Sequence, residues 1–213
     1  MVAASNEARR PRRIATVLFE GFELLDVFGP LEVFGVSEQF EVSLVGPAAG
    51  PVRSAQGQRV VAEVACHDAP APEIVLFPGG IGTRRLVEDE PFLSWLAGWS
   101  REASYVTSVC TGSGVLARAG LLDGYRATSN KRAFAWARQQ SERVEWVAEA
   151  RWVEDRDRWT SSGVAAGTDM ALALLARLYG EPHASGVADR IELEWHRDAT
   201  VDPFAAKNGL VPG

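Results

Sequence analysis

The chain has 213 residues, a length typical of one domain, and its 22 Lys and Arg against 28 Asp and Glu give a net charge of −6 at pH 7. An acidic chain has no diffuse positive field to attract nucleic acid or anionic lipid, so we expect neither as a partner. Hydrophobic residues make up 46% of the sequence, enough to build a large core without metals or disulfides. We therefore expect a compact, soluble globule.

The N-terminal segment is polar, and four of its first 13 residues are arginine. The apolar run that follows, Ile14–Phe19, is too short for a signal peptide. We therefore predict a disordered basic tail over residues 1–13 and a single domain over residues 14–213. No apolar stretch approaches the roughly 20 residues of a membrane span. The two cysteines, Cys66 and Cys110, are too few for a disulfide scaffold, so we predict a cytoplasmic protein.

Short apolar runs alternate with helical segments along the chain. The runs rich in β-branched and aromatic residues are predicted to be strands at Ile14–Phe19, Glu41–Val45, Ile74–Phe77 and Tyr105–Val109. Helical spacing of apolar residues predicts helices at Leu24–Phe34, Phe92–Glu102, Val115–Leu122, Val164–Tyr179 and Pro182–Trp195. This alternation, with strands apolar on both faces, predicts an α/β fold whose mostly parallel sheet is covered by helices on both sides.

Two segments interrupt the alternation. Short extended pieces at Pro51–Val64 and a Trp-rich stretch at Glu145–Thr160 are predicted to be β-hairpins added to the main sheet. After Trp195 the sequence becomes loop-like. We find no internal repeat and no linker, which favours one domain.

The segment around Cys110 has the layout of a nucleophile elbow. An apolar strand leads straight into Cys110, and a helix opens just after it. Such a turn needs small residues two before and two after the nucleophile, and Ser108 and Gly112 fill both places. The adjacent helix N-terminus would favour the thiolate, the form that attacks.

Free cysteines more often serve as small apolar packing residues. For Cys110 the coincidence of strand, small residues and helix start favours a reactive role instead. Cys66 lacks this context, since it precedes His67 and a Pro-rich loop, and we interpret it as an ordinary packing residue.

A second turn, Pro78-Gly79-Gly80, follows the strand Ile74–Phe77 and is expected at the same carboxyl edge of the sheet as Cys110. Glycines allow bare N–H groups to face a developing anion. Gly79 and Gly80, together with the N–H of Thr111, are therefore predicted to form an oxyanion or substrate-binding pocket. The alternative is an ordinary glycine turn without a ligand.

The third element lies just after the first strand, where Glu23 and Asp26 are three residues apart on one helix turn. Acids in a first turn usually interact with the helix dipole, and that explains Glu23. Asp26 is flanked by apolar residues, so burial should raise its pKa and let it hold or transfer a proton. The histidines have no metal-ligand spacing, and no metal is expected.

These motifs together resemble the ThiJ/PfpI superfamily of class I glutamine amidotransferase-like proteins, and most closely its isonitrile hydratase branch. The resemblance spans about Ile14 to Phe204 and rests on Leu25-Asp26 with Gly29-Pro30, Pro78-Gly79-Gly80, Val109-Cys110-Thr111-Gly112-Ser113, and Ala119–Gly124 with Ala127-Thr128. It implies a flavodoxin-like three-layer α/β/α sandwich and a homodimer. It also implies Cys110 as the nucleophile, Asp26 as its acid/base partner and Thr111 as an assisting residue.

In that branch a thiolate attacks the terminal carbon of an isonitrile, and water releases an N-substituted formamide without any cofactor. The resemblance thus implies a lyase acting on a small molecule. Two alternatives stay open: a glyoxalase or deglycase acting on methylglyoxal-like carbonyls, and a non-catalytic redox sensor in which Cys110 is oxidised.

The sequence departs from other members in two places. Thr111 follows Cys110 where the superfamily's proteases and many glyoxalases carry histidine, so protease activity is not expected. Ser129-Asn130-Lys131 stands where many relatives have Thr-His-Trp, which removes an imidazole near the thiol.

Transcription regulators with this domain add a helix-turn-helix module of about a hundred residues. The acidic 213-residue chain is expected to lack it and not to bind DNA.

Overall fold

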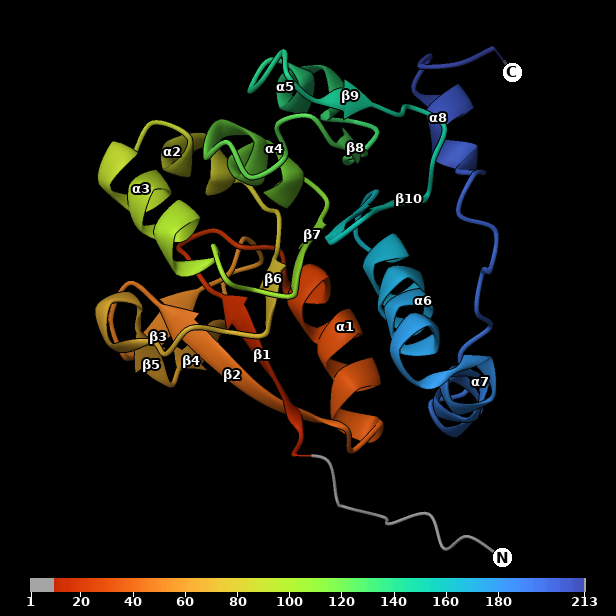
Figure 1. Ribbon diagram of the computed structural model, residues 1–213. Coiled ribbons are helices and arrows are strands. Elements are labelled where there is room, and N and C mark those ends of the chain that lie inside the picture. The colour runs from red at the N-terminus through yellow and green to blue at the C-terminus, as the bar shows by residue number, and fades with distance from the viewer. Residues whose placement is uncertain (1–9, 213) are drawn as a thin grey trace, which may run out of the picture.

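The computed structural model of the protein describes residues 10–212. Its centre is a seven-stranded sheet (Figure 1). In spatial order the strands are β10 (Trp152–Asp155), β11 (Arg158–Ser161), β7 (Tyr105–Val109), β6 (Ile74–Phe77), β1 (Arg12–Val17), β2 (Phe40–Gly46) and β5 (Val64–Ala65). All neighbouring pairs are parallel except β10 and β11, so the mostly parallel α/β fold is confirmed.

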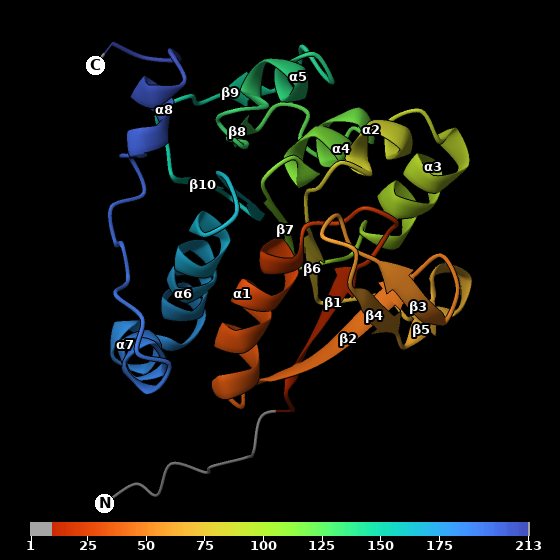
Figure 2. The same ribbon diagram turned by 180° about the vertical axis from the view of Figure 1, so that it is seen from behind.

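Helices cover both faces of this sheet, and Figures 1 and 2 show the two layers from opposite sides. One layer holds α1 (Leu24–Val36), α6 (Ala166–Tyr179) and α7 (Glu181–Arg190). The other holds α2 (Thr83–Leu86), α3 (Glu90–Trp99) and α4 (Gly112–Arg118). The remaining elements are β3 (Gly50–Arg53), β4 (Arg59–Ala62), η1 (Cys66–Asp68), β8 (Arg126–Ala127), α5 (Phe134–Arg138), β9 (Glu145–Trp146) and α8 (Pro203–Lys207).

Each face of the sheet has its own hydrophobic core, as β6 illustrates. Ile74 and Leu76 pack with α1 and α6, whereas Val75 and Phe77 pack with α3 and α4. Successive side chains of a strand point to opposite faces, so a strand between two helix layers must be apolar throughout. This explains why Ile74–Phe77 carries no polar residue and is completely buried.

The first strand begins earlier than predicted. We expected a disordered tail over residues 1–13, but Arg12 and Arg13 belong to β1 and pair with Phe40 and Glu41 of β2. Both arginines also lie within 4 Å of the carboxylate of Glu73, at 3.9 and 3.8 Å. Composition alone assigned Arg12 and Arg13 to the tail, but pairing with β2 and the charge of Glu73 hold them in β1. Residues 1–9 of the predicted tail lie outside the described part of the chain.

The two predicted hairpins have different outcomes. The β10–β11 hairpin joins the main sheet next to β7, as expected. The β3–β4 hairpin, predicted in the same role, instead forms a separate two-stranded sheet. The hairpin does not extend the main sheet because Val64 and Ala65, just after β4, form β5 and occupy the edge beside β2.

The segment after Trp195 contains a short helix, α8, where only loop was predicted. Pro203 stands at its start, and Asp202 Oδ1 accepts a hydrogen bond from the N–H of Phe204 at 3.0 Å. A proline at the first position and an aspartate before it are common at helix starts. None of the helices within residues 10–212 is long and apolar enough to cross a membrane.

Candidate functional site

Cys110 sits in a strained turn between β7 and α4. Its φ angle is 59°, a left-handed conformation that costs a non-glycine residue about 1–2 kcal/mol. Its N–H donates to the carbonyls of Ser161 and Ser162 at 3.2 and 3.0 Å, which holds the turn in place. A Cβ on Gly112 would lie 2.4 Å from the carbonyl oxygen of Phe77, so glycine is required there. The turn therefore has the backbone geometry of the expected nucleophile elbow.

Asp26 lies in the first turn of α1 and is completely buried. Its Oδ2 accepts a hydrogen bond from the N–H of Gly79 at 2.8 Å, while Oδ1 has no well-aligned partner among the described residues. Burial raises the pKa of Asp26 well above its usual value, and the charge of Glu23 adds to this. The Gly79 N–H and the thiol of Cys110 lower the pKa of Asp26 in part, which places the thiol beside the carboxyl.

The sequence predicted a thiol that ionises easily, but in the structure the pKa of the Cys110 thiol is raised. Burial raises its pKa above the ordinary value, and the negative charge of Asp26 raises it further. The N–H groups of Thr111 and Val164 and the hydroxyl of Thr111 lower this pKa, but less than burial raises it. The helix N-terminus therefore does not produce a free thiolate. The charge of Asp26 thus disfavours a thiolate beside it.

Val164 also contributes to the site, a role that the sequence analysis did not assign to it. Its N–H faces the Cys110 sulfur, and its φ angle of 41° is rare for a β-branched residue. Together with the N–H of Thr111 it forms a pair of backbone donors aimed at the sulfur. Valine has no recognisable signature for such a role, because the donor is the backbone.

The roles of Gly79 and Gly80 differ from the prediction. Their N–H groups are not free to face an anion, because Gly79 donates to Asp26 and Gly80 donates to Thr111 Oγ1 at 3.1 Å. A Cβ on Gly79 would lie 2.6 Å from the Thr111 nitrogen and 2.8 Å from the Cys110 Cβ. The turn after β6 therefore positions the carboxyl and Thr111 against the elbow and is not itself the oxyanion pocket.

Arg84, on α2, is a second group that sequence reasoning missed. It donates to Thr83 Oγ1 at 2.9 Å, and that hydroxyl lies 3.2 Å from Thr111 Oγ1. Its guanidinium carbon lies 3.8 Å from the ring centroid of Trp136. Burial lowers the pKa of Arg84, whereas a negative charge on Cys110 raises it, so the guanidinium lies near enough to interact with a charge on the sulfur. An arginine on a short helix is usually a surface residue, and its sequence context gave no other signal.

Cys66 lies in η1, after the edge strand β5, whereas Cys110 follows the central strand β7. Burial raises the pKa of Cys66 to about 11, a property of an unreactive thiol. Within residues 10–212, no three His, Cys, Asp or Glu side chains are grouped closely enough to hold a metal ion.

Comparisons with known proteins place this chain in a family. The pattern that defines the DJ-1/PfpI family matches residues 12–177. The isonitrile hydratase of Pseudomonas putida is 35% identical over 194 residues, which cover 90% of this chain and 81% of that enzyme. The HTH-type transcriptional regulator GbdR of Pseudomonas aeruginosa is 30% identical over 85% of this chain, but this match covers only 50% of the regulator.

Solved structures agree with the sequence comparisons. A ThiJ/PfpI family protein from Pseudomonas syringae superimposes with a TM-score of 0.76 and 30% identity, covering 90% of this chain and 81% of that protein. Drosophila melanogaster DJ-1beta superimposes with a TM-score of 0.75 at 19% identity, covering 87% of this chain and 100% of that one, a likeness of fold alone. On the match over residues 12–177 and these relatives, the chain belongs to the DJ-1/PfpI family.

Proposed function

We propose that this protein is a cysteine-dependent hydratase that converts isonitriles to N-substituted formamides. The observation that carries the proposal is the buried pair of Cys110 and Asp26, which lie close enough to alter each other's pKa. An isonitrile carbon must receive both a nucleophile and a proton, and a thiol beside a carboxylate can supply both. The 35% identity to an isonitrile hydratase supports the same reaction class.

In the proposed first step Asp26 takes the thiol proton while the Cys110 sulfur forms a bond to the terminal carbon of R–N≡C. Asp26 then delivers that proton to the same carbon, which gives an S–CH=N–R adduct on the enzyme. Water then adds its oxygen to this carbon and a proton to the nitrogen, which gives S–CH(OH)–NH–R. The C–S bond breaks as the hydroxyl becomes the formyl carbonyl, its proton returns to the sulfur, and R–NH–CHO leaves. The sum is R–N≡C plus H₂O giving R–NH–CHO, without an external oxidant or reductant.

Three neighbouring groups would stabilise charge during these steps. The N–H groups of Thr111 and Val164 face the sulfur and favour its anionic form. Arg84 adds a positive charge on the same side. Such preoriented groups act most strongly in a buried, water-poor site. They would offset the burial that raises the thiol pKa at the moment when the proton is transferred.

The two alternative functions have less support. Glyoxalase or deglycase chemistry in relatives uses an imidazole near the thiol, and Asn130 stands in that place. A redox-sensing cysteine is usually exposed with a low pKa. Cys110 is only 6% exposed, and burial raises its pKa.

The expected homodimer and cytoplasmic location also stay predictions. Leu25 and Phe28 on α1 are 45% and 42% exposed, which favours an assembly that covers them.

The test is mass-spectrometric detection of the N-formamide after incubation with alkyl and aryl isonitriles, with methylglyoxal assayed in parallel. We expect turnover by the wild type and by Cys66→Ala, and none by Cys110→Ala. Formamide production that survives Cys110→Ala, or no formamide from any isonitrile with the wild type, would contradict the proposal. Turnover of methylglyoxal alone would favour the glyoxalase alternative.

A further inference from the structure

A cavity of about 300 Å³ lies where three distant segments of the chain meet. Residues 130–132 form one wall, residues 162–165 form a second, and Phe204 and Asn208 of the α8 region form the third. This volume is at the small end of the range for ligand pockets, which runs from about 300 to 1,000 Å³.

Two of these walls lie next to residues that form hydrogen bonds with Cys110, or contain such residues. The carbonyl of Ser162 accepts a hydrogen bond from the Cys110 N–H at 3.0 Å, and the N–H of Val164 faces the sulfur. On the opposite side, the hydroxyl of Ser129 donates to the Cys110 carbonyl at 3.0 Å, one residue before the wall that starts at Asn130. Two walls of the cavity are therefore in contact with the Cys110 turn.

The walls carry apolar side chains beside polar ones, among them the exposed Arg132. Val164, Ala165 and the ring of Phe204, which is 52% exposed, present apolar surface. The side-chain amides are engaged within their own segments, since Asn130 accepts from the Ala133 N–H at 3.1 Å and Asn208 donates to the Phe204 carbonyl at 2.8 Å.

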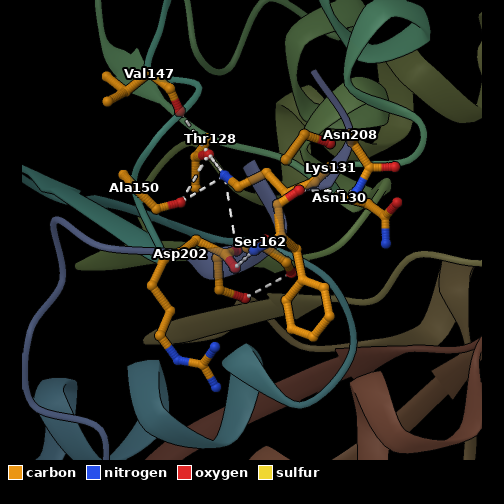
Figure 3. A network of polar contacts seen from close by, with 12 residues as sticks. Thr128, Asn130, Lys131, Val147, Ala150, Ser162, Asp202 and Asn208 are labelled. Atoms are coloured by element: carbon orange, nitrogen blue, oxygen red, sulfur yellow. Dashed lines mark hydrogen bonds and ion pairs between the residues drawn. The ribbon is translucent and has the colours of Figure 1, made fainter. Parts of the chain in front are cut away.

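Lys131, the buried charge in these walls, belongs to a polar network (Figure 3). Lys131 Nζ donates to Thr128 Oγ1 at 2.7 Å and to the Ala150 carbonyl at 2.5 Å, and lies 3.9 Å from Asp202 Oδ2. Asp202 in turn caps α8 through the Phe204 N–H. The network therefore joins α8 to the wall at residues 130–132 and fixes where Phe204 lies.

We propose that this cavity receives the R group of the substrate and that Phe204 limits its size. The proposal rests on the function proposed above and adds a subsite and a specificity-determining residue. The reacting carbon would bind at Cys110, and the R group would extend toward α8. In this view the Lys131–Asp202 pair holds Phe204 in its position at the cavity.

The main experiment compares hydration of methyl, tert-butyl, cyclohexyl and 2-naphthyl isonitrile by the wild type and by Phe204→Ala. Removing the ring should raise kcat/KM for the naphthyl compound by about 10-fold or more, the usual scale for pocket-size discrimination, and leave the methyl compound within about 2-fold. Phe204→Leu should lie between the two. Val201→Ala is the matched control, because Val201 is an exposed neighbour that does not line the cavity, and it should change no ratio. Equal effects of Phe204→Ala on all four compounds would overturn the proposal.

A second measurement does not depend on hydratase activity. In a Cys66→Ser background, Cys110 is alkylated with iodoacetamides that carry N-methyl, N-cyclohexyl or N-naphthyl groups, and the rates are followed by intact mass. Phe204→Ala should raise the naphthyl rate relative to the methyl rate, and Val201→Ala should not. If no isonitrile is hydrated but Phe204→Ala still raises the ratio of the naphthyl to the methyl alkylation rate, the proposed reaction is wrong and Phe204 does limit the size of the occupant. If this ratio is unchanged, Phe204 does not limit the size, whatever the outcome of the hydration assay.

Discussion

The behaviour of Cys110 depends on the carboxyl next to it. A thiol close to a helix N-terminus is often a thiolate, but this one is buried and faces a second acid. The charge of Asp26 disfavours a thiolate, whereas the thiol of Cys110 lowers the pKa of Asp26. In the proposed mechanism Asp26 accepts the thiol proton and then returns it to carbon, so it would decide whether the sulfur can attack.

Asp26→Asn tests this coupling. Asparagine keeps the shape and carries no charge, so the pKa of the Cys110 thiol should fall, because the carboxylate that raises it is gone. Turnover should nevertheless fall by about 10²–10⁴-fold, since proton transfer is lost. The thiol pKa is measured from the pH dependence of alkylation in a Cys66→Ser background, and the fold is checked by circular dichroism. An unchanged thiol pKa together with unchanged turnover would contradict the assigned role.

At the scale of elements, the site forms where two βα turns approach each other more closely than side chains would allow. The turn after β6 donates one N–H to Asp26 and one to Thr111, and the turn after β7 presents the thiol. Gly79 permits this approach, because any Cβ there would overlap the backbone of Thr111. The glycine that we predicted as an anion donor thus acts by being small and by holding the acid.

Gly79→Ala should therefore destabilise the protein by about 1–3 kcal/mol, the usual result of overpacking, and reduce turnover by displacing the elbow. Gly98→Ala provides the matched control. Gly98 lies in α3, and no atom lies within 4 Å of the position that a Cβ would take there, so alanine should stabilise by about 0.5–1 kcal/mol. Urea unfolding of both variants measures whether each substitution lowers or raises the free energy of unfolding. A Gly79→Ala protein as stable as the wild type would show that the two turns can separate without cost.

At the scale of the whole molecule, buried ion pairs connect the C-terminal segment to the sheet. Asp169 in α6 accepts from Arg151 Nε at 2.8 Å and from the backbone N–H of His196 at 2.9 Å. Lys131 and Asp202 form the second pair. Removing one partner of a buried pair is costly, because the other charge is left without compensation. These pairs therefore fix the path of residues 195–204, which carries Phe204 to the cavity.

The Lys131 amine makes stability depend on pH. Burial lowers its pKa from 10.5 to about 8, although the charges of Asp202 and Glu149 oppose this. Above about pH 8 the folded protein loses this proton while the unfolded chain still holds it, so stability rises with pH until the unfolded lysine also titrates. Relative to Lys131→Met, the wild type should gain about 2 kcal/mol between about pH 7.5 and about pH 10. Urea unfolding of both proteins across this range measures the gain, and a constant difference would contradict it.

The sequence by itself determined the layer architecture and the chemical candidates. Strands such as Ile74–Phe77 are apolar at every position because both faces are buried, and that pattern is local. The small residues around Cys110 and the acid among apolar neighbours at Asp26 are local signals too. For this reason the elbow and its acid could be predicted residue by residue. The separate β3–β4 sheet could not, because it depends on the pairing of β5 with β2. The start of α8 has a local signal, Asp202-Pro203, which the prediction of a loop overlooked.

Only the tertiary structure decided what these candidates do to one another. Burial by both helix layers, not the adjacent helix end, sets the thiol pKa, and burial is a property of the assembled fold. The backbone N–H of Val164 and the charge of Arg84 act on the sulfur from other elements. Phe204 reaches the cavity wall from a segment more than 90 residues beyond Cys110 in the sequence because buried charges hold it there. Such long-range contacts leave no local pattern in a single sequence.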